Sequence, residues 1–327
     1  MKLRHVFYGV LLLLGLAAPF MFYPVFVMRA LCFALFACAF DLMLGYTGLL
    51  SFGHAAFFGT AAYVTGYMVK VQGLSPGLGI LAGTAAALIL GAIFGGLVIR
   101  RQGIYFAMIT LALAQLMYFV YLQAPFTGGE DGLQGIPRGR LLWVINLEND
   151  RTLYYVVFAI FVFGLLVINR TIHSPFGQVL KAIRENEPRA LSLGYDVNKY
   201  KLTAFILSAG LAGLAGSTKS IVFTFVTLTD VDWHTSGDVV LMTLLGGMGT
   251  LFGPIAGAFS IVGLENQLAD KLGSLVTVFI GAIFVVCVLL FRRGIVGEIT
   301  ALYNRVAGSR PRNEKVDFSA GSSAGGM

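Results

Sequence analysis

The sequence has few charged residues for its length. Asp, Glu, Lys and Arg together make up 12% of the 327 residues, whereas a soluble domain usually carries about 25%. Hydrophobic residues make up 57% of the chain. A chain of this composition cannot cover its own surface with polar groups, so we expect lipid to be part of its solvent.

The residue patterns of common catalytic and metal sites are also missing. None of the four histidines has metal-ligand spacing to another histidine or to a cysteine. No Gly-Lys dipeptide occurs, which excludes a P-loop. The three cysteines all lie in apolar runs, as is typical of packing residues. We therefore expect no enzyme activity and no bound cofactor, and any ATP that drives this chain must bind to a partner.

Long apolar runs are the dominant feature of the sequence. Stretches of about 18 or more apolar residues are typical of membrane-spanning helices. Several runs carry no charge at all, and others are shorter or broken by glycine. The pattern predicts an all-α, polytopic membrane protein with about eight full spans and additional Gly-broken half-helices. The predicted spans are residues 6–28, 30–45, 54–69, 78–99, 103–122, 152–169, 200–219 and 272–291.

The basic residues predict the orientation of these spans. If the N-terminus is cytoplasmic, sixteen of the 23 Lys and Arg residues fall on the inside, as the positive-inside rule requires. We expect a bacterial inner-membrane protein with both termini in the cytoplasm. The net charge of +7 then needs no nucleic acid to explain it. Residues 1–305 form the predicted membrane domain, and the Gly/Ser-rich residues 306–327 a disordered cytoplasmic tail.

Two apolar segments, residues 44–54 and 244–254, are interrupted by glycines. Irregular backbone at membrane depth is tolerated only where protein buries it or where it lines a wet cavity. A pair of broken segments, one in each half of a chain, is typical of a transport pathway, although both could be simple loop ends at the membrane face. The predicted pathway residues are Gly45, Tyr46, Thr47, Gly48, Ser51, Phe52, Gly53, His54, Gly246, Gly247 and Gly249.

Two ionisable residues lie beside the first interruption. His54 follows it directly, and a histidine that packs and hydrogen-bonds between helices is an alternative to a pathway role. Asp41 precedes the first interruption, near the inner end of its own span. A role in helix pairing explains this residue as well as a role in the transport pathway does. The sequence leaves open whether either residue contacts a substrate.

Two polar loops separate the spans. Residues 123–151 form the predicted outside loop, in which Thr127, Gly128 and Gly129 either help to admit substrate or belong to an inert connector. Residues 170–199 form the predicted inside loop, with two short amphipathic helices; Ser174 and Pro175 begin the first, and Gly194 ends the second. Mixed charge there suits a protein partner better than lipid headgroups.

Several motifs together resemble the LivM-type permease of branched-chain amino-acid ABC importers. They are LGYTGLLSFGHAAFFG at 44–59, GIYFAMITLALAQ at 103–115, TGGEDGL at 127–133, SPFGQVLKAIRENEPRALSLGYDVNKYKLTAF at 174–205 and LLGGMGTLFGPIAGA at 244–258. The resemblance covers nearly the whole chain. It implies the ABC importer permease architecture, with ATP-driven transport of Leu, Ile and Val, and an ABC permease for urea, amides or other amino acids as the alternative.

The resemblance also implies partners and a coupling site. The expected partners are a LivH-like second permease, two cytoplasmic ATPase subunits that bind ATP and Mg, and a periplasmic substrate-binding protein. Residues around 184–194 are expected to form the coupling helix that docks in an ATPase groove; Ala190 and Gly194 fit the family pattern, whereas Pro188 and Arg189 depart from it. The residues expected to couple transport to the ATPase are Arg184, Glu185, Glu187, Arg189, Ala190 and Gly194.

Two rival classes of function remain less well supported by the residues. A secondary transporter would need an intramembrane chain of carboxylates or histidines, and only Asp41, His54 and Glu265 are available. A membrane-embedded enzyme would need a clustered nucleophile, metal site or acid–base pair. Co-purification of a P-loop ATPase separates an ABC permease from both rivals.

Overall fold

The structure is a computed structural model that describes residues 15–20, 22–141 and 145–272, together with residues 281–282, 294 and 297. Most of the predicted span 272–291 lies outside the described residues, and so does the first part of the predicted span 6–28. The whole predicted tail 306–327 also lies outside them.

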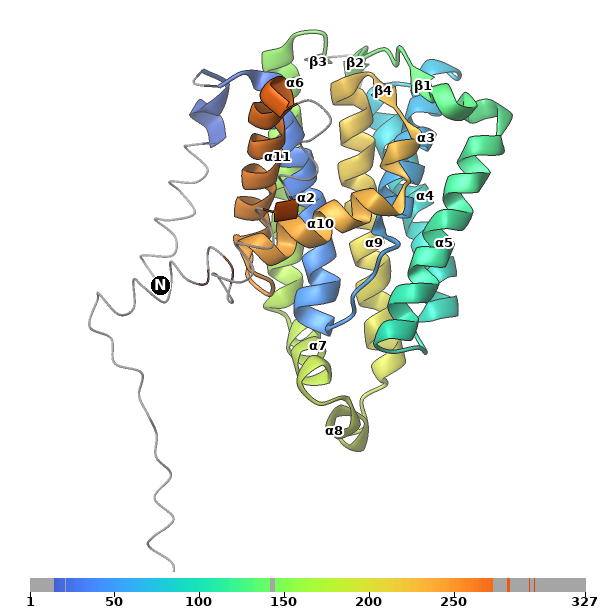
Figure 1. The fold of residues 1–327 in the computed structure, drawn as a ribbon, viewed down its shortest axis with the longest axis vertical. Helices are drawn as coiled ribbons and strands as arrows, with labels where there is room; N and C mark the ends of the chain where they lie inside the picture. The colour runs from blue at the N-terminus through green and yellow to red at the C-terminus, as the bar shows by residue number, and fades with distance from the viewer. Residues whose placement is uncertain are drawn as a thin grey trace, which may run out of the picture.

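The described chain is a bundle of long helices (Figure 1). The first half contains α2 (Pro24–Thr47), α3 (His54–Lys70), α4 (Pro76–Val98) and α5 (Ile104–Gln123). The second half contains α6 (Asp150–Ile172), α7 (Pro175–Glu185), α8 (Glu187–Ser192), α9 (Val197–Phe223), α10 (Trp233–Gly246) and α11 (Gly253–Leu272).

Short elements of other kinds occupy the connections. The 3₁₀ turns are η1 (Pro125–Thr127), η2 (Gly129–Asp131) and η3 (Leu228–Asp230), and the strands are β1 (Leu133–Gln134), β2 (Arg140–Leu141), β3 (Ile145–Asn146) and β4 (Phe225–Val226). Strand β1 pairs antiparallel with β4, and β2 with β3. These two-residue ladders are the main departure from the all-α expectation, and they fall in the polar loops.

Five of these helices, α2, α4, α5, α6 and α9, are long and apolar enough to cross a membrane. They match the predicted spans 30–45, 78–99, 103–122, 152–169 and 200–219 to within a few residues at most ends. The predicted span 54–69 is α3, which has only 17 residues. The described residues thus agree with a mostly helical, polytopic membrane protein, while the count of eight spans stays a prediction.

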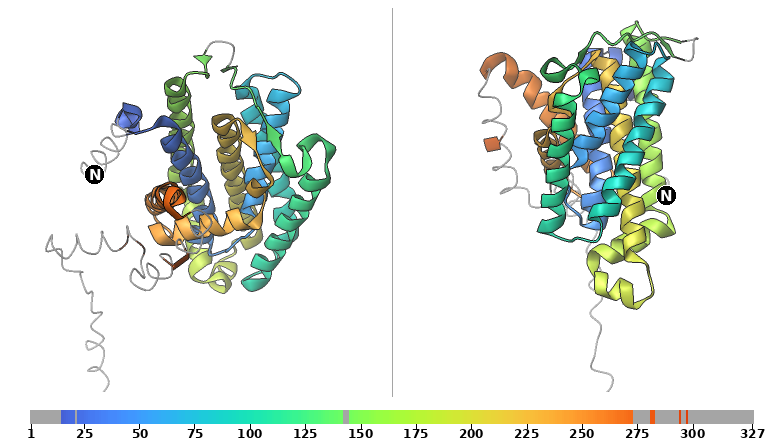
Figure 2. Two further views of the ribbon diagram at one scale, coloured as in Figure 1. Left: turned by 45° about the horizontal axis from the view of Figure 1, so that its top comes forward. Right: turned by 90° about the vertical axis from the view of Figure 1, so that its right-hand side faces the viewer.

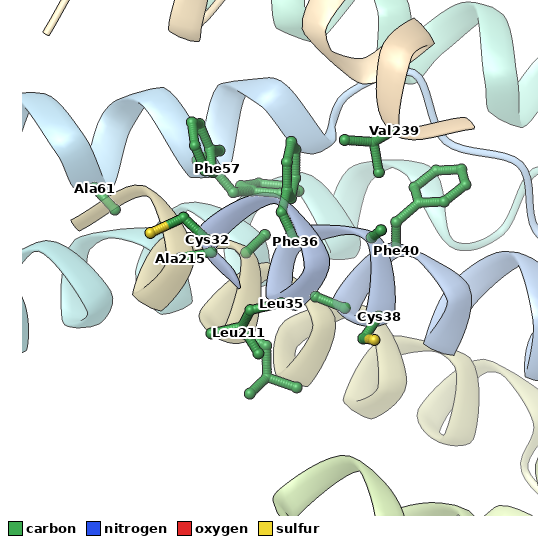
Figure 3. Close-up of a cluster of buried hydrophobic side chains, with 14 of the residues drawn as sticks. Cys32, Leu35, Phe36, Cys38, Phe40, Phe57, Ala61, Leu211, Ala215 and Val239 are labelled. Carbon is green, nitrogen blue, oxygen red and sulfur yellow. The ribbon is translucent and has the colours of Figure 1, made fainter. Parts of the chain in front are cut away.

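Helices α2 and α9 form the centre of the bundle. Within their most apolar windows, 78% of the residues of α2 and 89% of those of α9 are buried, against 28% for α5. Figure 3 shows how α2 side chains such as Cys32 and Phe36 pack between Phe57 of α3 and Ala215 of α9. Both cysteines of α2 are buried and unpaired, in agreement with the packing role predicted for them.

Small residues allow the helices to approach closely, as the four-residue spacing of glycines predicts. A Cβ on Gly83 of α4 would lie 2.4 Å from the carbonyl oxygen of Ala61 in α3, and one on Gly91 would lie 2.5 Å from Cβ of Ala209 in α9. A Cβ on Gly216, two turns further along α9, would lie only 2.0 Å from the carbonyl oxygen of Phe58 in α3. Helix α9 therefore packs closely against both α3 and α4.

Helices α10 and α11 form the second interrupted segment. Helix α10 runs obliquely across the bundle in Figure 1, and α11 then runs back alongside α2. The chain thus turns back between α10 and α11. Pro254 lies in the first turn of α11, where its missing N–H removes no helical hydrogen bond.

The two predicted polar loops lie at opposite ends of the bundle. Helices α7 and α8 project from one end, and the strands β1 to β4 lie at the other (Figures 1 and 2). Since the two loops are separated by the length of the bundle, they face different sides of any membrane that the helices cross.

We predict that Gly216→Ala destabilises the protein, because the new methyl group would overlap the Phe58 carbonyl, a backbone atom that cannot swing aside. Overpacking of this kind costs about 1–3 kcal/mol. The melting temperature of the detergent-solubilised protein should fall. Gly96→Ala is the matched control, because it lies in a membrane helix with no atom within 4 Å of its added Cβ. Equal melting temperatures for Gly216→Ala and the parent would contradict the close packing of α3 on α9.

Candidate translocation and coupling site

The first interruption connects α2 to α3. Helix α2 ends at Thr47, and Gly48 takes the left-handed conformation, with φ of 75°, while its N–H donates to the Met43 carbonyl. The chain then runs in irregular conformation to the start of α3. Side chains supply hydrogen bonds that the backbone lacks there: the Phe52 N–H donates to Oγ1 of Thr110 on α5 over 3.1 Å. The break is therefore a built element, held in part by α5.

The second interruption connects α10 to α11. Gly247 and Gly249 both have positive φ, at 114° and 74°, which glycine adopts without steric cost. The hydroxyl of Thr250 donates to the Gly247 carbonyl over 2.9 Å and accepts from the Gly253 N–H over 3.0 Å. This side chain thus closes the turn that begins α11.

The two interruptions meet at Asp41. Its carboxylate, on α2, accepts the N–H of Gly249 with distances of 2.9 and 3.2 Å to the two oxygens. A Cβ on Gly45, one turn further along α2, would lie 2.3 Å from Oδ1 of Asp41 and 2.5 Å from the Gly249 nitrogen. Only glycine fits between them, so Gly45 and Gly249 are required where the segments touch. The carboxylate of Asp41 therefore links α2 to the second interruption.

The coupling loop reaches the same place through Arg184 of α7. Nη1 of Arg184 donates to the carbonyl of Gly45. The stem of the same side chain covers Gly48, where an added Cβ would lie 3.2 Å from Cγ of Arg184. Three segments that are far apart in the sequence, the end of α2, the 247–252 turn and α7, are thereby joined at one point.

A cavity of about 400 Å³ opens at this junction. It is lined by residues from all three segments, namely Gly45, Tyr46, Lys181, Arg184, Glu185 and Gly249. Three of the predicted pathway residues and two of the predicted coupling residues thus share one cavity. The predicted site residues Gly246 and Gly247 lie behind it, where a Cβ on Gly246 would overlap the Gly253 carbonyl.

Other predicted pathway residues point into the protein interior and do not line the cavity. His54 is fully buried at the start of α3, and its Nε2 lies 2.8 Å from Oγ of Ser208. Because Ser208 donates its own proton to the Ala39 carbonyl, we assign the Nε2 proton to His54. The rings of Phe40, Phe57 and Phe205 surround the imidazole. The geometry of His54 is that of a packing residue between helices.

The remaining members of the first interruption also serve its structure. Thr47 donates to the Met43 carbonyl over 2.6 Å, one turn back in α2. Oγ of the buried Ser51 accepts the Gly53 N–H over 3.2 Å. A Cβ on Gly53 would lie 2.9 Å from the Thr110 carbonyl, so glycine is needed where the chain passes α5.

The inside loop folds into two helices, as its capping residues predict. Oγ of Ser174 accepts the N–H of Gly177 at the start of α7. The side chain of Asn186 accepts the N–H of Arg189 and begins α8, and Gly194 follows α8 with φ of 86°. Nothing lies within 4 Å of a Cβ added to Gly194, so its outer face is open.

Two of the predicted coupling residues face inward. Glu187 accepts from Nζ of Lys201 over 2.6 Å and from the side-chain amide of Gln102 over 2.8 Å, which fixes α8 against α9. Ala190 is 2% exposed and packs with Ile183 and Val197. Both residues therefore position α8 rather than present a surface.

The outward face of α8 contains apolar residues that were not among the predicted coupling residues. Leu191 and Leu193 are 56% and 68% exposed, beside the exposed Arg189 and Gly194. Burial of Ala190 turns these leucines outward. The sequence contains no signal for this surface, because only Leu191 of the two leucines lies in the six-residue helix and the buried face depends on contacts of Ala190 with Ile183 and Val197.

The predicted outside loop is a folded structure at the other end of the bundle. Thr127 is fully buried, and its hydroxyl donates to the Tyr121 carbonyl over 2.5 Å. Gly128 has φ of 80° and leaves no room for a Cβ beside the Gly132 carbonyl. Thr127, Gly128 and the left-handed Gly129 therefore shape the turn, while Glu130 is the exposed side chain at its tip.

A buried ion pair beneath this loop was not singled out from the sequence. Nζ of Lys219, in the last turns of α9, lies 2.7 and 2.6 Å from the two carboxylate oxygens of Asp230 in η3. Both side chains are only 8% exposed. Hydropathy does not reveal this pair, because Asp230 follows a turn that brings it back to the end of α9.

Comparison with known proteins agrees with this architecture. The family described as the permease component of branched-chain amino acid transport systems matches residues 25–288. The high-affinity branched-chain amino acid permease LivM of Escherichia coli is 29% identical over 82% of this chain and 69% of its own length. LivM of Salmonella typhimurium is similar to the same extent. No solved structure matches the chain significantly.

Two further relatives bear on partners and cargo. A probable LivH permease of Methanocaldococcus jannaschii is 32% identical over 28% of this chain and 29% of its own length. The autoinducer 2 permease LsrC of Klebsiella pneumoniae is 29% identical over 55% of this chain and 52% of its own length.

The described residues contain no group of three or more metal-ligating side chains. The match over residues 25–288, the apolar helices and the paired interruptions all agree with one another. This chain belongs to the family of permease components of branched-chain amino acid transport systems.

Proposed function

We propose that this chain is a membrane subunit of an ATP-driven importer that moves leucine, isoleucine and valine into the cytoplasm. The two LivM relatives carry that cargo in their names. The chain works with a LivH-like second permease, two cytoplasmic ATPase subunits that bind ATP and Mg, and a periplasmic substrate-binding protein. The similarity to a LivH permease supports the pairing of two related membrane subunits.

The proposed transport mechanism rests on one set of contacts. Arg184 of α7 holds the Gly45 carbonyl, and Gly45 touches Gly249. A displacement of α7 by an ATPase subunit therefore acts directly on both interrupted segments. The helices then expose the pathway to each side of the membrane in turn, and the ATPase supplies the differential contacts that shift the two states.

The docking face of this mechanism is the outer surface of α8. Its open Gly194, exposed Arg189 and exposed leucines fit a groove with an apolar floor and a charged rim. Glu185 lies at the edge of the same surface. The end of the bundle that carries α7 and α8 is cytoplasmic in this proposal, and the end that carries Thr127–Gly129 is periplasmic, as the distribution of basic residues favours.

The cargo is tested by uptake into cells that express the complete transporter. Labelled leucine should accumulate in an ATP-dependent manner and require the binding protein, whereas labelled urea and glutamate should not accumulate. Failure of a P-loop ATPase to co-purify with the chain would contradict the proposal and favour a secondary transporter.

A different cargo is the second candidate. The similarity to permeases named for autoinducer 2 import supports it, because related membrane subunits then serve different solutes. Uptake of urea, an amide or another amino acid in place of leucine would keep the ABC mechanism and change only the cargo.

We predict that Gly194→Arg abolishes uptake and weakens co-purification of the ATPase subunit. The side chain has free space in this chain, so it would obstruct only a partner. The strain of a positive φ, about 1–2 kcal/mol, is shared by the control Gly73→Arg. Gly73 has φ of 66° and is equally open, but it lies at the far end of α3. If both variants behave alike, or if Gly194→Arg assembles and transports normally, α8 is not the docking element.

A further inference from the structure

The cavity at Arg184 has the size and the lining of a small-molecule site. Its volume of about 400 Å³ lies within the range of about 300–1,000 Å³ that such sites occupy. Two cationic side chains, Lys181 and Arg184, and one anionic side chain, Glu185, face it together. A structural junction alone does not require charges of both signs around an open volume.

These charges have capacity left for a ligand. Among the described residues, Lys181 and Glu185 form no ion pair, and Nζ of Lys181 lies 5.7 Å from the centre of the Tyr46 ring. Arg184 uses Nη1 for the Gly45 carbonyl, and a guanidinium has five N–H donors. The carboxylate of Asp41 accepts the Gly249 N–H and lies close enough to attract Arg184, but it forms no ion pair with that side chain. Within the described part of the chain, neither Lys181 nor Arg184 is therefore in an ion pair.

The arrangement matches the two ends of an α-amino acid. Arginine and lysine form strong, charge-assisted hydrogen bonds with a carboxylate, and Glu185 supplies an acceptor for an ammonium group. The ring of Tyr46 offers apolar surface for a side chain. We propose that this cavity binds a free α-amino acid through its carboxylate at Lys181 and Arg184, on the side of the membrane where α7 lies. The proposal rests on the proposed function for the side and for the identity of the amino acid.

Occupation of this site has a consequence for coupling. A carboxylate attracts a guanidinium more strongly than a neutral carbonyl does, because it carries a full negative charge and can accept two of the N–H groups. A bound amino acid therefore pulls the Arg184 side chain toward the cavity and weakens its contact with the Gly45 carbonyl, which joins α7 to the first interruption. Accumulated amino acid on that side then slows its own import.

The experiment uses the complete membrane complex with its ATPase subunits in nanodiscs, without the binding protein, and labelled leucine as the probe. Leucine should bind saturably and be displaced by unlabelled leucine but not by leucinamide, which lacks the carboxylate. Lys181→Gln should weaken the binding about tenfold, which corresponds to about 1.4 kcal/mol. Lys199→Gln is the matched control, since Lys199 is 82% exposed in the same loop and pairs only with Asp196 among the described residues.

A second measurement tests the consequence in proteoliposomes supplied with binding protein and ATP. For each variant, the ratio of leucine uptake into leucine-loaded and unloaded vesicles is compared, which cancels differences in basal rate. In the parent, uptake into leucine-loaded vesicles should be several-fold lower than uptake into unloaded vesicles, so the ratio lies well below one. In Lys181→Gln the two uptakes should be more nearly equal, so the ratio lies closer to one.

The outcomes separate this inference from the proposed function. A parent complex that imports no leucine contradicts the proposed function. A parent that imports leucine but binds none in the nanodisc, or binds it equally with Lys181→Gln, overturns only the cavity site. Loss of the ATPase subunit from Lys181→Gln with unchanged leucine affinity would show that the cavity seats an acidic side chain of the partner, which also overturns it.

Discussion

Backbone that leaves a helix at membrane depth must still find hydrogen-bond partners, because lipid supplies none. In this protein the partners come from elements far away in the sequence. The Asp41 carboxylate takes the Gly249 N–H, the Thr110 hydroxyl takes the Phe52 N–H, and Arg184 donates to the Gly45 carbonyl. Each interruption thus takes hydrogen bonds from other elements: the two interruptions contact each other, and α5 and α7 contact the first.

This mutual dependence explains how a loop outside the bundle can act on its interior. A continuous helix satisfies its own backbone and transmits little to its neighbours. In the proposed mechanism, an interrupted helix completed by Arg184 changes when Arg184 moves, and Gly45 passes the change to Gly249, which it contacts. Within the bundle, glycines such as Gly91 and Gly216 let α9 pack closely against α4 and α3.

Much of this could be predicted from the sequence. Hydropathy located the five helices that are long and apolar enough to cross a membrane, because apolar length is a property of each segment alone, and glycine runs located both interruptions. Ser174, Pro175 and Gly194 predicted the two short helices through local capping chemistry. What local rules could not give was pairing across the fold.

The missed features all depend on such pairing. Asp41 binds Gly249 over 208 residues of sequence, Lys219 pairs with Asp230 beneath a strand ladder, and Glu187 turns inward to Lys201.

For the central claim, that Arg184 couples α7 to the interruptions, the most direct measurement is leucine imported per ATP hydrolysed. Arg184→Ala should keep ATP hydrolysis but lower this ratio at least tenfold, with partial recovery in Arg184→Lys and no change in Lys199→Ala. An unchanged ratio in Arg184→Ala would contradict the account.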